Sequence, residues 1–119
     1  PEDQAGVPRF QGRVAEAAWC ARNAVGAGEP GRAGYFNFLV GLGERGSGAR
    51  ARKARQPGDI GILASTDPVG CDQAAWDLVT DRIDGPLHEW VGYRQEPGAL
   101  LDRAGELGLG AREYRLVEV

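Results

Sequence analysis

The chain has 119 residues and a formal net charge of -3, so it fits one domain with a modest core, and its overall field gives no case for nucleic acid or a membrane surface as partner. Its 19 glycines are about twice the average usage and follow no collagen-like period, which predicts many turns and loops. No stretch reaches the roughly 18 consecutive apolar residues of a transmembrane helix, and we expect a cytoplasmic protein with reduced thiols.

Apolar residues recur with helical or strand spacing along most of the chain. The predicted elements are a helix over residues 9–25, strands over 32–40 and 59–65, a helix over 69–78, a short helix or irregular cover within 81–96, a helix over 98–107, and a closing strand from residue 113. Strands interleaved with helices predict a small layered α/β domain over residues 1–119, with a sheet of about three to four strands flanked by amphipathic helices.

Residues 59–78 form the strand-loop-helix unit on which the candidate site depends. The strand is short and apolar, which suits burial on both faces. Asp67-Pro68 is typical of a helix start, because Asp caps free amides of the first turn and Pro at the first position loses no hydrogen bond. Ligands of α/β sheets gather where strands end and helices begin. The candidate binding residues are therefore the polar ones in this loop and the first helical turns: Ser65, Thr66, Asp67, Asp72 and Gln73.

A purely structural interpretation of the same residues stays open. Asp67 then serves only as a helix cap. Asp72 and Gln73 are then exposed, or complement the helix dipole.

Cys20 and Cys71 stand far apart in the sequence and share no CxxC motif. Two thiols cannot complete a structural zinc site or a four-cysteine iron–sulfur cluster. We therefore interpret each as a small buried hydrophobe and assign no metal ligand to this chain. His88, the only histidine, is interpreted as structural or exposed, because no serine in a nucleophile-elbow context accompanies it.

Residues 41–46 match a GxGxxG pattern directly after a predicted strand. A dinucleotide fingerprint also needs a helix with an apolar face and an acidic residue at the end of the next strand, whereas Asp59 begins its strand. Residues 45–55 carry five basic side chains. Such a run is typical of a solvated loop, and it is also suited to contacts with phosphate groups.

The segments on either side of this basic loop resemble a known family. They are Gly34-Tyr35-Phe36-Asn37-Phe38-Leu39, Asp59-Ile60-Gly61-Ile62-Leu63-Ala64-Ser65-Thr66-Asp67-Pro68-Val69, Asp72-Gln73-Ala74, Asp77-Leu78-Val79 and Glu106-Leu107-Gly108-Leu109-Gly110-Ala111-Arg112-Glu113-Tyr114. Together they are similar to the C-terminal portion of the domain of unknown function 362 family, whose members are described as iron–sulfur centre proteins. The resemblance implies that this chain is the C-terminal fragment of a longer protein, whose missing upstream ferredoxin-like module holds a 4Fe–4S cluster.

The chain departs from that family pattern between the two predicted strands. Members tend to carry a Cys-x-Cys there, whereas residues 44–56 are basic and contain no cysteine. Either this member has lost a pair of metal ligands, or the reading frame slips locally between Leu42 and Asp59. Cluster ligation by this chain itself is therefore not expected.

Two functions follow from these observations. The first is a C-terminal scaffold portion of an iron–sulfur protein, which shapes the site of a cluster-bearing module that exchanges electrons with a partner. The alternative is a module that binds an anion or nucleotide through helix N-termini and the basic loop.

Overall fold

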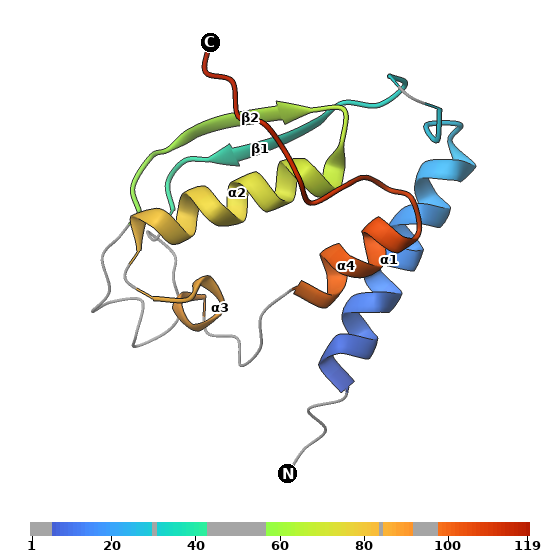
Figure 1. The fold of residues 1–119 in the computed structure, drawn as a ribbon, viewed down its shortest axis with the longest axis horizontal. Helices are drawn as coiled ribbons and strands as arrows, with labels where there is room; N and C mark the ends of the chain where they lie inside the picture. The colour runs from blue at the N-terminus through green and yellow to red at the C-terminus, as the bar shows by residue number, and fades with distance from the viewer. Residues whose placement is uncertain (1–5, 30, 43–56, 84, 92–97) are drawn as a thin grey trace.

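The described part of the chain is a mixed α/β structure with four helices and a two-stranded sheet (Figure 1). The computed structural model describes residues 6–29, 31–42, 57–83, 85–91 and 98–119. The elements are α1 (Gly6–Ala24), β1 (Tyr35–Leu39), β2 (Gly61–Ser65), α2 (Pro68–Arg82), α3 (Leu87–Trp90) and α4 (Gly98–Glu106). None of the helices in these ranges combines the length and apolarity needed to cross a bilayer.

The sheet differs from the predicted one in its number of strands. β1 and β2 pair antiparallel, with Tyr35 opposite Ser65 and Leu39 opposite Gly61. Within the described residues the sheet has these two strands, so the expected three to four are not found there. The prediction of a closing strand from residue 113 is wrong, because residues 113–119 form no strand.

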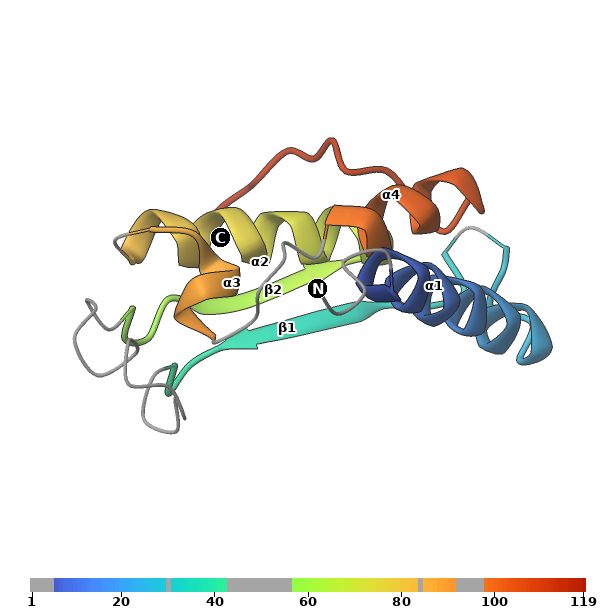
Figure 2. The same ribbon diagram turned by 90° about the horizontal axis from the view of Figure 1, so that it is seen from below.

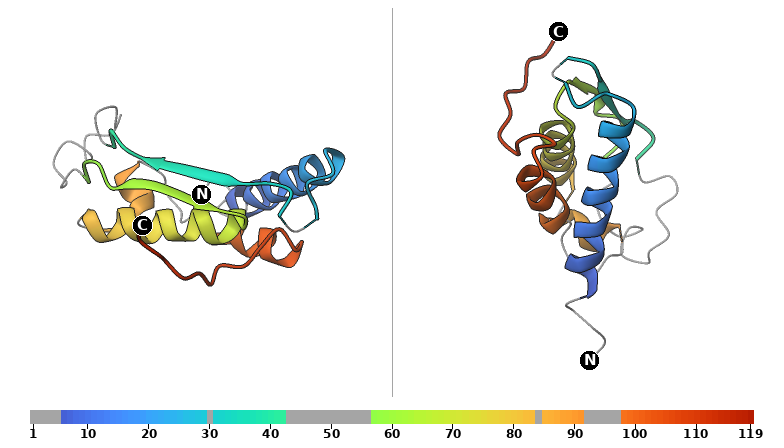
Figure 3. Two further views of the ribbon diagram at one scale, coloured as in Figure 1. Left: turned by 90° about the horizontal axis from the view of Figure 1, so that it is seen from above. Right: turned by 90° about the vertical axis from the view of Figure 1, so that its right-hand side faces the viewer.

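Each strand alternates between a face that packs on helices and a face that does not. Leu39 of β1 is buried with Val79 of α2 in one of the two apolar clusters, and Leu63 of β2 packs against the same cluster. Ile62 lies between the inward positions of β2 and is 58% exposed. Figures 2 and 3 show α2 and α3 on one side of the sheet and no described element on the other. The prediction that the 59–65 strand is buried on both faces is therefore wrong.

α2 begins where the sequence predicts. Asp67 has extended backbone angles and its side chain accepts a hydrogen bond from the Gly70 amide, while Pro68 occupies the first helical position. A carboxylate at this position satisfies an amide that has no partner inside the helix. The turn between β2 and α2 is thus fixed by Asp67 and Pro68, and the strand-loop-helix unit is confirmed.

The helices divide the molecule into two halves that meet along a short seam. We call α1 and α4 the helical pair, because α1 packs mainly against α4. We call β1, β2, α2 and α3 the sheet half. The seam is an apolar cluster to which α2 contributes Val69 and Trp76, and the helical pair contributes Ala15, Leu101 and Ala104. The chain after α4 closes the seam with Leu109, which is also buried in this cluster.

Candidate functional site

The loop between β2 and α2 is held by its own hydrogen bonds. Ser65 Oγ accepts a bond from the Asp67 amide at 3.0 Å. One carboxylate oxygen of Asp67 accepts from the Gly70 amide at 2.9 Å, and the other accepts from the Ala111 amide at 2.9 Å. The negative charge that a helix N-terminus favours is therefore supplied by the chain itself.

This geometry bears on the alternative function, an anion or nucleotide site. An external anion at the start of α2 would have to displace the Asp67 carboxylate, which already bonds to Gly70 and Ala111. The second feature on which that function depends, the basic loop over residues 45–55, lies outside the described residues, as does most of the GxGxxG pattern. The anion or nucleotide function therefore remains a prediction, and the geometry of the helix start does not support it.

Asp72 and Cys71 lie on the side of α2 that faces β1. Asn37 of β1 donates to Asp72 Oδ1 at 2.8 Å and to Cys71 Sγ at 3.5 Å. The amide of Asn37, an unusual residue in an apolar strand, therefore ties the inner face of β1 to the first turns of α2. Burial raises the pKa of the Cys71 thiol, and the neighbouring charge of Asp72 raises it further.

Gln73 points away from these residues, onto the opposite side of α2. Its amide nitrogen donates to Asp77 Oδ1 at 2.9 Å, and its oxygen accepts from Arg112 Nε at 2.7 Å. Arg112 also donates to Asp102 of α4 at 2.7 Å, and its guanidinium carbon lies 5.9 Å from the ring centre of Trp76. Gln73 thus takes part in a contact between α2 and the chain after α4.

Tyr114 adds a second contact on the same side of α2. Its hydroxyl donates to Asp77 Oδ2 at 2.8 Å, and this bond raises the pKa of the phenol, because the neutral form is the donor. Asp77, Arg112 and Tyr114 were not among the predicted site residues, although all three lie in segments that carry the family resemblance. The sequence signal that they share is weak, since polar side chains of these types are usually solvated.

The five predicted site residues therefore do not converge on one ligand. Ser65 and Asp67 form the helix start, Thr66 is exposed beside them, Asp72 faces β1 and Gln73 faces the tail. Except for Thr66, each side chain has a hydrogen-bond partner within the chain. The geometry favours the structural interpretation of this set.

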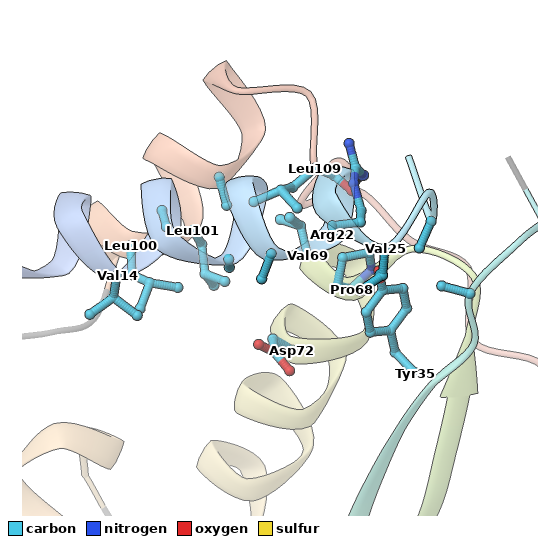
Figure 4. A pocket seen from close by; sticks show the side chains of 16 residues that line it. Val14, Arg22, Val25, Tyr35, Pro68, Val69, Asp72, Leu100, Leu101 and Leu109 are labelled. Atoms are coloured by element: carbon cyan, nitrogen blue, oxygen red, sulfur yellow. The ribbon is translucent and has the colours of Figure 1, made fainter. Parts of the chain in front are cut away.

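An apolar groove of about 520 Å³ lies between the two halves. Figure 4 shows Val14 of α1 and Val25, just after α1, together with Leu100 and Leu101 of α4 facing the start of α2. Its two charged lining residues, Arg22 and Asp72, both bond within the chain: Arg22 donates to the carbonyl oxygens of Leu109 and Gly108 at 3.2 and 3.3 Å. The groove thus offers mainly apolar surface.

A second apolar surface is the outer face of the sheet, which we define by Phe36, Phe38 and Ile62. Phe36 and Phe38 are two positions apart on β1, and Ile62 lies directly opposite Phe38 on β2. Their exposed fractions are 61, 63 and 58%. Three large side chains thus form one continuous surface, because residues two apart on a strand share a face.

The donor set of the described residues does not fit an iron–sulfur cluster. Cys20 is exposed on α1, which contradicts its predicted burial, whereas Cys71 is buried under β1 as predicted. Cys20 lies five residues after Ala15, about 140° around the helix, so it faces away from the seam that Ala15 contacts. No group of three or more His, Cys, Asp or Glu side chains with metal-binding geometry occurs among these residues.

No family model, curated protein or solved structure matches this chain in comparisons of its sequence and fold.

Proposed function

We propose that the chain is the scaffold portion of an iron–sulfur protein, and that a ferredoxin-like module carrying a 4Fe–4S cluster packs on the outer face of the sheet. The observation that carries this proposal is the outer face itself, with Phe36, Phe38 and Ile62 more than half exposed on one side of a two-stranded sheet. The resemblance to iron–sulfur centre proteins supplies the identity of the covering module.

The exposed area of these three side chains is large enough to contribute to association with the module. Phe side chains bury about 150 to 250 Å² each, so covering the exposed portions of the three side chains removes roughly 300 Å² of apolar surface from water. At about 25 cal/mol per Å², the gain is about 7 kcal/mol before the costs of association. Exposed apolar patches of this kind often mark interaction sites on soluble proteins.

The polar residues of the chain support a scaffold rather than a reactive role. Asp67, Asp72 and Gln73 orient neighbouring backbone and side chains through hydrogen bonds of 2.7 to 2.9 Å. The cluster would be ligated by cysteines of the covering module, since the thiols of Cys20 and Cys71 do not fit that task. When bound, the cluster supplies one-electron transfer, and this chain supplies the apolar surface that positions the module.

The test begins with the complete product of the encoding gene. Sequencing upstream of Pro1 and across residues 42–59 identifies the cysteine motifs and fixes the reading frame. The full product is then analysed for iron content and for the visible absorption of an iron–sulfur cluster. A gene product without iron and without further cysteine motifs would remove the basis of the proposal.

The surface is tested by binding between this chain and the separately produced module. Phe38→Asp places a charge at the centre of the outer face, and we expect it to weaken binding at least about tenfold, because a buried unpaired carboxylate is costly. Val117→Asp places the same charge on an exposed residue of the tail and serves as the matched control. Equal affinities of the two variants would show that the module does not pack on this face.

A further inference from the structure

The segment after α4, residues 110–114, runs across α2 (Figure 1), and we call it the strap. Figure 2 shows it on the side of α2 that faces away from the sheet. Its contacts with α2 use side chains at three successive points: Asp67 accepts from the Ala111 amide, Gln73 accepts from Arg112, and Asp77 accepts from Tyr114.

The close approach of the strap to α2 depends on Gly70. A Cβ at this position would lie 3.2 Å from the carbonyl oxygen of Ala111, which is tighter than ordinary van der Waals contact between such atoms. The strap therefore lies against the helix backbone itself. Its fit is specific to this stretch of α2.

Arg112 joins three parts of the molecule through one guanidinium group. It donates to Gln73 of α2 and to Asp102 of α4, and it lies over the ring of Trp76 in the seam. α2 belongs to the sheet half and α4 to the helical pair. Arg112 thus links the two halves outside the groove, whose lining does not include it, while the apolar contribution of α2 to the seam comes from Val69 and Trp76.

We propose that the strap is a latch: it detaches from α2 as a unit, with Arg112 as the residue that holds it, and its release frees the helical pair to move against the sheet half. Leu109 is the fixed end of the latch, since it is buried in the seam. Beyond Leu109 every residue is half-buried or exposed. The boundary between anchored and detachable chain therefore falls at Gly110.

The latch opens readily because its contacts are partly solvated. The side chains of Arg112 and Asp102 are 37 and 62% exposed, so their ion pair holds the strap with far less free energy than global unfolding requires. Segments held by few buried contacts open locally at a small fraction of the cost of global unfolding. Opening uncovers the side of α2 that carries Gln73, Trp76 and Asp77, and it loosens the wall of the apolar groove formed by the helical pair.

Two measurements on the full chain test the latch. The first is the hydrogen exchange rate of the Ala111 amide, followed by NMR. The second is the distance distribution between spin labels on the helical pair and on the sheet half. Cys20 is exposed on α1 and provides one label site, Phe38→Cys provides the other on β1, and buried Cys71 stays unlabelled in the folded protein.

Arg112→Ala is compared with Arg115→Ala, which removes the same type of side chain from an exposed position three residues further on. We expect Arg112→Ala to speed exchange of the Ala111 amide about tenfold and to broaden the spin-label distribution, while Arg115→Ala changes neither. A distribution in Arg112→Ala as narrow as in Arg115→Ala would overturn the proposal.

A second variant covers the case in which Arg112→Ala does not fold. Asp102→Asn leaves the Arg112 to Gln73 bond in place and removes only the charge on α4. Broadening of the distribution in Asp102→Asn supports the latch, and an unchanged distribution overturns it.

Discussion

Asp67 provides the sharpest test of how the start of α2 is built. One of its oxygens caps the Gly70 amide and the other accepts from the Ala111 amide of the strap. Asp67→Ala removes both bonds. Asp67→Asn keeps a cap of nearly equal quality, but it places an NH₂ group where the Ala111 amide needs an acceptor.

The expected losses follow from these two bonds. Loss of the cap costs about 1 kcal/mol, and loss of the bond from the Ala111 amide to a charged acceptor costs about 1 kcal/mol more at this exposed position. Asp67→Ala should therefore lower the free energy of unfolding by about 2 kcal/mol, and Asp67→Asn by about half of that. With a urea dependence of about 1.5 kcal/mol per molar, the midpoint for Asp67→Ala falls by about 1.3 M.

Urea unfolding followed by circular dichroism measures the loss, and hydrogen exchange assigns it to the two bonds. Asp67→Ala should speed exchange of both the Gly70 and the Ala111 amide, whereas Asp67→Asn should speed only that of Ala111. Asp81→Ala, at an exposed acidic residue of the same helix, is the control and should change stability by less than about 0.5 kcal/mol. Equal midpoints for Asp67→Ala and Asp81→Ala would refute the assignment of both bonds.

Three further predictions concern a glycine in α4 and one just after it, the two thiols, and Tyr114 in the tail. Gly108 has φ +76°, so Gly108→Ala should destabilise the protein by about 1 kcal/mol or more. Gly105 lies inside the helix, where an added Cβ makes ordinary contacts, so Gly105→Ala should stabilise the protein by about 0.5 to 1 kcal/mol. Urea unfolding measures both changes. A thiol-specific chromogenic reagent should modify exposed Cys20 rapidly and buried Cys71 only on the timescale of opening, because burial raises the pKa of the Cys71 thiol; equal rates would contradict this burial. The hydrogen bond to Asp77 raises the pKa of Tyr114 in the folded state. Its contribution to stability is therefore complete below the pKa of the unfolded phenol and is lost as the pH rises through the folded-state pKa. Tyr114→Phe should abolish this alkaline loss of stability in urea unfolding measured across pH.

Local signals in the sequence were sufficient to predict the helices. The amphipathic spacing of residues 9–25 and 98–107 corresponds to α1 and α4, and Asp67-Pro68 marks the start of α2. Gly108 follows the helical pattern of residues 98–107, where a left-handed glycine is typical, and its φ is positive. Caps and glycine turns depend on a few neighbouring residues, so they can be read without knowledge of the tertiary structure.

The sheet and the site depend on contacts between distant residues, and there the sequence was less informative. The alternation of Tyr114 and Leu116 with charged residues resembles a strand, but Tyr114 bonds to Asp77 and the Ala111 amide bonds to Asp67, so the tail follows α2 instead of a strand edge. The predicted site residues were chosen for their position in the chain. Their partners, such as Arg112, lie some forty residues away, and no local pattern indicates such pairs.

The composition of β1 has a consequence for handling the protein in isolation. Tyr35–Leu39 contains three aromatic residues and no charge or proline, and in the described sheet both strands are edge strands with one unpaired side. Short segments of this kind are templates for intermolecular strand pairing. We therefore expect the isolated chain to aggregate through these edges as its concentration rises.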